Sequence, residues 1–91
     1  MKIITWNEEK NQLLQLTRGI SFEEILEKIE KKEILARKKH PNSKKYPNQM
    51  IFVFKIKGYI YYVPYVEDEK SIFLKTIIPS RKLNKEYNNE K

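Results

Sequence analysis

The spacing of the apolar residues changes once along this chain. It is typical of helices in the first third and of extended strands in the remainder. Residues 22–29 carry one apolar stripe at the i, i+3, i+4, i+7 spacing of an amphipathic helix. The stripe consists of Phe22, Ile25, Leu26 and Ile29. Ser21 and Glu24 form a capping-box sequence, so the pattern predicts a helix that begins directly after Ser21.

A second helix is predicted upstream of this one. Asn7 is a favourable N-cap, and the two acidic residues that follow it suit the first turn of a helix. Gly19 is a typical stop signal. Residues 2–6 precede the cap and are predicted as a short strand. The side chains that we expect to point into the core are Leu13, Leu14 and Leu16.

Residues 50–78 are rich in β-branched and aromatic side chains and are interrupted by turn sequences at Lys57-Gly58 and at 67–70. This pattern is typical of an antiparallel meander. Ser80 can cap a short last helix that begins at Arg81. The predicted strands of this part of the chain are residues 34–36, 50–56, 59–66 and 71–78.

The order of these elements predicts a single α+β domain over residues 1–91. We expect two layers, in which two N-terminal helices pack on a three- to four-stranded antiparallel sheet, with a short C-terminal helix. A chain of 91 residues buries only a modest core. We therefore expect a functional site in a shallow surface groove.

Basic residues are unevenly distributed in a chain whose net charge is +7. Residues 37–45 hold five of them, no acid, and His40, the single histidine, whereas the acids gather at 23–33 and 67–69. This segregation is typical of a surface that binds nucleic acid. Three adjacent acids in a hairpin turn are more typical of a solvated tip than of a metal site.

Several classes of protein are excluded or disfavoured by composition. The absence of cysteine excludes a disulfide scaffold, a thiolate zinc site and a cysteine nucleophile, and a single histidine argues against a transition-metal site. No apolar run approaches the ~20 residues of a membrane span. Residues 1–6 become polar too soon for a signal peptide. We expect a cytoplasmic protein without a metal or cofactor.

His40 is the one side chain whose ordinary pKa lies near neutrality. RNA can be cleaved without a metal if a base removes the 2′-hydroxyl proton and cations stabilise the phosphorane. A solvated histidine before a proline turn explains His40 equally well. Arg81 at a predicted helix start forms a phosphate-binding corner. Further candidate RNA contacts are Lys39, Lys44, Lys45, Tyr46, Lys82, Lys85 and Tyr87. Most aromatic residues of the meander are expected to be core.

Three short blocks occur in a characteristic order and spacing. They are Trp-Asn-Glu-Glu-Lys-Asn at 6–11, Arg-Gly-Ile-Ser-Phe-Glu-Glu at 18–24 and Ile-Ile-Pro-Ser-Arg-Lys at 77–82. Together they resemble the BrnT-type toxins of bacterial type II toxin–antitoxin systems, which have a RelE-like ribonuclease fold. The resemblance implies a metal-independent endoribonuclease that cleaves mRNA and inhibits translation and growth. It also implies a hetero-oligomer with a cognate antitoxin, typically a ribbon-helix-helix protein.

The resemblance implies that Lys10 and Arg81 correspond to basic cleft residues of the family. Together with His40 they are the predicted catalytic residues. The chain departs from the family pattern in three places. Arg18 stands where the family has histidine, residues 40–49 are not the usual insert, and the helix after Arg81 is shorter. The alternatives are a non-catalytic RNA- or DNA-binding regulator and a structural domain whose open sheet face is covered by another protein.

Overall fold

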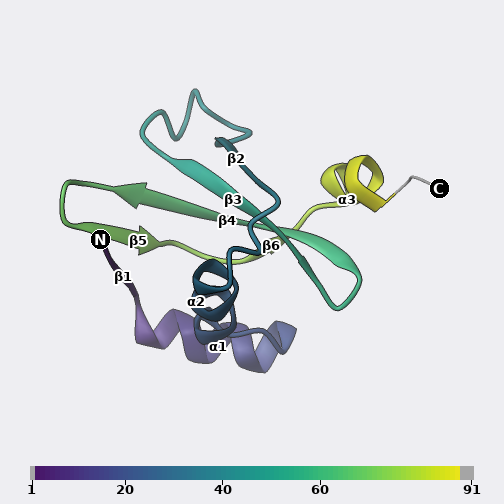
Figure 1. Cartoon of the computed structure of the whole chain (residues 1–91), viewed down its shortest axis with the longest axis horizontal. Helices are drawn as coiled ribbons and strands as arrows, with labels where there is room; N and C mark the ends of the chain where they lie inside the picture. Colours follow the sequence, from purple (N-terminus) through teal and green to yellow (C-terminus); the bar gives the residue numbers. More distant parts are fainter. Residues whose placement is uncertain (1, 89–91) are drawn as a thin grey trace.

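A six-stranded mixed sheet forms the centre of the computed structural model, which describes residues 2–88 (Figure 1). The strands lie in the order β1-β5-β4-β3-β2, and β6 pairs with β4 outside this path. The predicted α+β class is confirmed. In chain order the elements are β1 (Ile3–Trp6), α1 (Glu8–Arg18), α2 (Phe22–Glu30), β2 (Ala36–Lys39), β3 (Met50–Ile56), β4 (Tyr59–Glu67), β5 (Ser71–Leu74), β6 (Ile78–Pro79) and α3 (Arg81–Asn88).

The ends of the first two helices are set by the residues that the sequence indicated. The Asn7 side chain accepts a hydrogen bond from the Lys10 N–H at 2.9 Å, and Gly19 ends α1 with φ of 66°. Both hydrogen bonds of the capping box between Ser21 and Glu24 are present at the start of α2. The predicted starts of both helices are therefore confirmed.

The β3–β4 hairpin is also as predicted, with Lys57 and Gly58 both at positive φ in its turn. The prediction of one strand over 71–78 is wrong. The Lys75 N–H donates to the Pro64 carbonyl at 2.8 Å, but proline has no N–H to complete the pair, so β5 ends at Leu74. The chain returns to the sheet as β6, beside Tyr61 and Tyr62 of β4.

Two further strand predictions need correction. The short strand after α2 is Ala36–Lys39 rather than 34–36, so the first part of the basic segment belongs to the sheet. The N-terminal strand β1 pairs with β5 in parallel, which makes the sheet mixed and larger than three or four strands. Short strands whose partners are distant in sequence carry no local signal for their pairing.

The two faces of the sheet bury different helices. Alternation along β3 turns Phe52 and Phe54 toward the core that Leu14, Phe22 and Ile25 of α1 and α2 complete. The opposite face forms a smaller core of Ile51, Val53 and Ile60 with Leu83 of α3. The expected two-layer arrangement with all helices on one side is therefore wrong for α3, which covers the other face.

The inward face of α1 also differs from the prediction. Leu14 is buried, but Leu13 is 51% exposed and Leu16 is 85% exposed. Asn11 is fully buried in their place. Its Oδ1 accepts from the Phe22 N–H at 2.7 Å, and its Nδ2 donates to Glu23 at 2.8 Å. The buried stripe of α1 thus contains a polar residue that binds the start of α2.

Within 2–88, every helix is too short or too polar to cross a bilayer.

Candidate nucleic-acid interface

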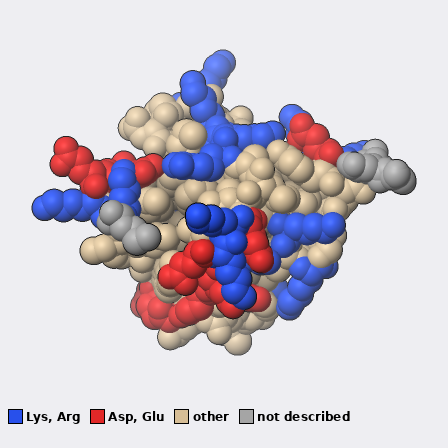
Figure 2. Space-filling view, in the orientation of Figure 1, with Lys and Arg blue, Asp and Glu red and all other residues tan. Residues whose placement is uncertain are grey.

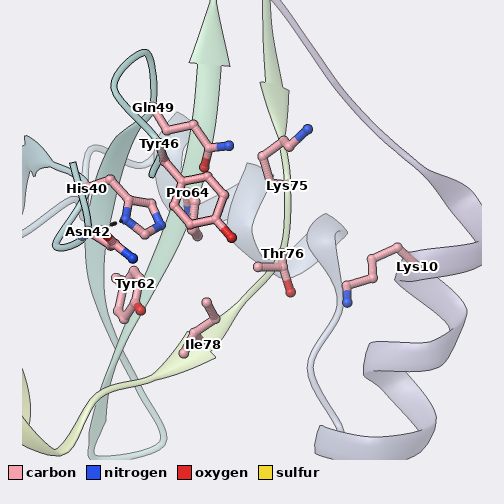
Figure 3. Close-up of a pocket in the computed structure, with 10 residues that line it drawn as sticks. All are labelled: Lys10, His40, Asn42, Tyr46, Gln49, Tyr62, Pro64, Lys75, Thr76 and Ile78. Carbon is pink, nitrogen blue, oxygen red and sulfur yellow. Dashed lines mark hydrogen bonds between the residues drawn. The ribbon is translucent and has the colours of Figure 1, made fainter. Parts of the chain in front are cut away.

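A pocket of about 480 Å³, here called the His40 pocket, lies where four distant parts of the chain meet (Figure 3). The loop 40–49 forms one wall with His40 and Tyr46. Tyr62 and Pro64 of β4 form the floor, and the segment that leaves β5 supplies Lys75 and Thr76. Lys10 reaches the pocket from α1, on the side opposite His40. The pocket is a surface groove assembled from a few side chains.

The His40 pocket is suited to an anion. Lys10 and Lys75 line it, and none of the described residues around it is acidic. Figure 2 shows Lys and Arg gathered over β2 and the loop that follows it, whereas acids concentrate at the β4–β5 turn and over α1 and α2. Over α2 the acids are interspersed with lysines, as in the Lys31–Glu27 ion pair of 3.0 Å. The loop side of the sheet therefore carries a group of basic side chains, and Figure 2 shows further ones at the right of the view.

Hydrogen bonds within the loop 40–49 hold its side chains in place. The His40 N–H donates to the Gln49 carbonyl at 3.2 Å, which closes the base of the loop. The Tyr46 N–H donates to the Asn42 carbonyl at 2.9 Å, and the Gln49 N–H donates to the Tyr46 carbonyl at 3.2 Å. These bonds turn the Tyr46 ring onto that of His40, with ring centroids 4.6 Å apart. The aromatic wall of the pocket is thus preorganised.

The protonation state of His40 follows from its neighbours. The backbone N–H of Asn42 donates to Nδ1 at 3.0 Å, so Nδ1 is an acceptor and carries no proton. Partial burial lowers the pKa of His40 below its ordinary value of 6.5, because the charged form is desolvated. His40 is therefore a neutral imidazole at neutral pH, and its proton is on Nε2.

This arrangement predicts a definite titration of His40. Ring NMR at pH 7 should show a protonated Nε2 and a bare Nδ1, and the pKa of His40 should lie below 6.5. As the pH falls below 6.5, the unfolded chain takes up the proton first, so the free energy of unfolding decreases until the folded imidazole also titrates. A proton on Nδ1 at pH 7, or a raised pKa, would contradict the geometry.

A second groove of about 410 Å³, here called the α3 groove, adjoins the His40 pocket. Lys38 and Lys39 of β2 line one side of it, and Lys82 at the start of α3 lines the other together with the acidic Glu86. Tyr62 lines both concavities and therefore joins them. The His40 pocket and the α3 groove are thus two separate, neighbouring concavities that share one tyrosine.

The three predicted catalytic residues are not all brought together. Lys10 and His40 line the same pocket, although they are 30 positions apart in sequence. Arg81 begins α3, is exposed, and lines neither the His40 pocket nor the α3 groove. Ser80 next to it caps the helix, because its hydroxyl accepts from the Leu83 N–H at 3.1 Å. The role of Arg81 stays a prediction.

The predicted RNA contacts divide into three groups. Tyr46 lines the His40 pocket, and Lys39 and Lys82 line the α3 groove. Exposed positions outside the two concavities are occupied by Lys44, Lys45 and Lys85. Tyr87 packs against the smaller core, with the Lys38 ammonium 5.6 Å from the centre of its ring. Tyr87 thus has a packing function, and its contact with RNA remains a prediction.

Sequence reasoning missed most of the other residues that line the His40 pocket, among them the aromatic Tyr62 and the charged Lys75. Tyr62 belongs to the aromatic-rich meander, most of whose rings the sequence assigns to the core. Lys75 was treated as part of a regular strand, although it is the single charged residue in the otherwise uncharged segment 72–78. A lone charge inside an apolar strand pattern was the signal that it leaves the core.

The acidic turn 67–69 has a structural role. The Asp68 carboxylate accepts hydrogen bonds from the N–H groups of Lys70 and Ser71, which lower its pKa below the ordinary value of 3.8. Glu67 pairs with Lys2 at 2.6 Å. Within residues 2–88 no three His, Asp or Glu side chains are grouped in a way that could hold a metal ion.

Comparison with known proteins adds nothing to this geometry. No family model, no curated protein and no solved structure matches the chain. The fold and the two basic concavities define a small α+β protein with a cationic, aromatic-lined surface.

Proposed function

We propose that this protein is a metal-independent endoribonuclease of the toxin–antitoxin type, which cleaves mRNA and thereby inhibits translation and growth. The observation that carries the proposal is the His40 pocket, where Lys10 and Lys75 line the side across from an imidazole and a tyrosine, with the Lys75 ammonium resting over the Phe73 ring 5.4 Å from its centroid. Two cations and one neutral N–H donor suit the developing negative charge of a phosphorane. The order of the three sequence blocks supports the choice of a toxin-type ribonuclease as the class of enzyme.

Each side chain has a proposed task in this mechanism. Lys10 and Lys75 stabilise charge on the non-bridging phosphate oxygens, and the His40 Nε2–H donates a hydrogen bond to one of them. Proton uptake by His40 must occur at Nδ1, so the Asn42 N–H has to move away first. Arg81 is proposed to hold the phosphate of a neighbouring nucleotide from the start of α3.

The second candidate is a non-catalytic RNA-binding regulator. One observation favours it: the only imidazole in the chain has its basic nitrogen occupied by the Asn42 N–H. A protein that only binds RNA needs the cations and aromatic rings of the two concavities but no free base. The two candidates share a binding surface and differ in whether RNA is cut.

Incubation of the purified protein with single-stranded RNA in EDTA separates the two candidates. The endoribonuclease should release fragments that end in 2′,3′-cyclic phosphate, because the 2′-oxygen loses its proton and attacks the adjacent phosphorus, while the bond to the 5′-oxygen of the next nucleotide breaks and that oxygen gains a proton. Expression without the antitoxin should arrest growth, and Arg81→Ala should be far easier to express. Intact RNA after long incubation in EDTA would favour the regulator. Full toxicity of Arg81→Ala would remove Arg81 from the mechanism.

The proposed partner is a cognate antitoxin, expected to be a ribbon-helix-helix protein that forms a hetero-oligomer with this chain in the cytoplasm. A ribonuclease active on mRNA must be held inactive in the cell that makes it. The resemblance of the three sequence blocks supports this part of the proposal. Restoration of growth when the partner is co-expressed, together with loss of cleavage in the purified complex, would test it.

A further inference from the structure

We infer that the loop 40–49 forms a nucleobase-stacking subsite, and that the RNA segment bound along the two concavities is single-stranded. The inference rests on the proposed function for the identity of the ligand as RNA. It adds which chemical group of the RNA the loop recognises and which form of RNA can reach it. Nothing in the three sequence blocks includes this loop.

The Tyr46 ring is the centre of the subsite. One side of it lies against His40, and the Lys45 ammonium is over the ring, 5.4 Å from its centre. Lys45 is an exposed, flexible side chain, whereas the backbone of Tyr46 is fixed by hydrogen bonds. A nucleobase stacked on tyrosine is bound more strongly than an exposed ammonium. The base therefore displaces Lys45, whose charge remains close enough to meet a phosphate.

The opposite sides of the His40 pocket match the two ends of a nucleotide. Aromatic rings of Tyr46, His40 and Tyr62 occupy one side, with the His40 and Tyr62 centroids 6.2 Å apart. Lys10 and Lys75 occupy the other side (Figure 3). The volume of about 480 Å³ falls within the range of about 300–1,000 Å³ of small-ligand pockets. A base on the ring side places its phosphate toward the lysines.

Polar side chains near the rings can bind the edge of the base. Gln49, Asn42 and Thr76 line the pocket and offer both donors and acceptors. Because every base has a stacking face, the rings give affinity for any nucleotide, and these side chains supply whatever preference exists. The α3 groove continues the path across Tyr62 and offers Lys39 and Lys82 to the next phosphate. The bound segment therefore covers at least two nucleotides.

A base can lie on Tyr46 only if it is unpaired. Bases of an RNA duplex are stacked inside the helix, and the faces that Tyr46 needs are covered by their neighbours. A duplex presents its phosphates and sugar hydroxyls but no free base face, so it cannot bind to the aromatic side of the pocket. Single-stranded RNA is thus the form that uses both sides of the His40 pocket.

The experiment measures binding separately from cleavage. A fluorescent 2′-O-methyl RNA strand, which lacks the attacking 2′-hydroxyl, is titrated with the wild type by anisotropy, alone and annealed to its complement. Tyr46→Ala should bind the single strand about tenfold more weakly or worse, as expected for loss of one stacked base. Tyr46→Phe should keep most of the affinity. Tyr59→Ala is the matched control, since Tyr59 is a partly exposed tyrosine beside the β3–β4 turn.

Tight single-strand binding that Tyr46→Ala weakens, while the duplex binds less well, would support the subsite. Equal affinity of Tyr46→Ala and wild type, equal affinity for the duplex, or no binding at all would overturn it. Thermal unfolding of each variant shows whether the loop substitution has disturbed the fold, and Tyr46→Phe decides the question if Tyr46→Ala unfolds. If the protein binds the 2′-O-methyl strand but does not cleave unmodified RNA in EDTA, the proposed enzyme is contradicted and the subsite is not. If the protein cleaves RNA in EDTA but Tyr46→Ala binds RNA as tightly as the wild type, the subsite is contradicted and the proposed enzyme is not.

Discussion

Replacement of Lys10 by glutamine should slow RNA cleavage by about 10²–10³-fold, the usual cost of removing one preorganised group that stabilises transition-state charge. Lys10 is partly buried on α1 and lines the pocket opposite His40. Glutamine keeps a long polar side chain and the helix propensity of lysine, so the change removes mainly the charge. The rate is measured in single turnover with saturating RNA in EDTA.

Lys31→Gln is the matched control for Lys10→Gln. Lys31 is the C-cap residue of α2 and lines neither of the two concavities. Its pair with Glu27 is exposed, so its loss should leave both fold and cleavage nearly unchanged. If Lys10→Gln cleaves as fast as Lys31→Gln, Lys10 is not part of the mechanism. Comparison with Arg81→Gln then shows whether the reaction takes place at the start of α3.

The second large effect is expected on stability. Asn11→Ala should lower the free energy of unfolding by about 2–4 kcal/mol, because it removes hydrogen bonds to Phe22 and Glu23 and leaves a buried N–H without its acceptor. Small domains have only about 5–15 kcal/mol in total, so this is a large share. Urea unfolding followed by circular dichroism measures the change.

The neighbouring variant Gln12→Ala serves as the control, since Gln12 is exposed on the same helix and should change stability by less than about 0.5 kcal/mol.

The effect of Asn11→Ala should also depend on pH. The Asn11 side-chain hydrogen bond is the main cause that lowers the pKa of Glu23 below 4.5. That stabilisation is present above pH 4.5 and is lost as Glu23 is protonated, so the two proteins should differ less in acid. A pH-independent difference would contradict the Glu23 contact.

The three sequence blocks gain a structural explanation from these contacts. The first and second blocks touch through the Asn11–Glu23 hydrogen bond and through the stacked rings of Trp6 and Phe22, whose centroids are 5.6 Å apart. Arg18 of the second block donates to the carbonyl of Ile77 in the third at 2.6 Å. Much of the resemblance therefore concerns how α1, α2 and the sheet are joined. Lys10 is the member of the first block that faces the His40 pocket.

Several features of the fold could be predicted because their causes are local. The Asn7 cap, the Ser21–Glu24 capping box and the Lys57-Gly58 turn each depend on residues within a few positions of one another. The alternation of aromatic residues along β4 was likewise readable, since the two-residue period places neighbours on opposite faces. The basic segment that begins at Arg37 was found in the same way, from composition over nine positions.

The amino-acid sequence by itself determined the helix starts, the central hairpin, the α+β class and the excess of positive charge, because each follows from residues close together in the chain. Only the tertiary structure decided that α3 covers the second face, that the chain leaves the sheet after β5, and that Lys10 and Lys75 line the same pocket as His40. Those outcomes depend on which strands pair and which faces are buried. The strand pairing and the buried faces are those that minimise the free energy of the whole chain, so they cannot be predicted from a short window of residues.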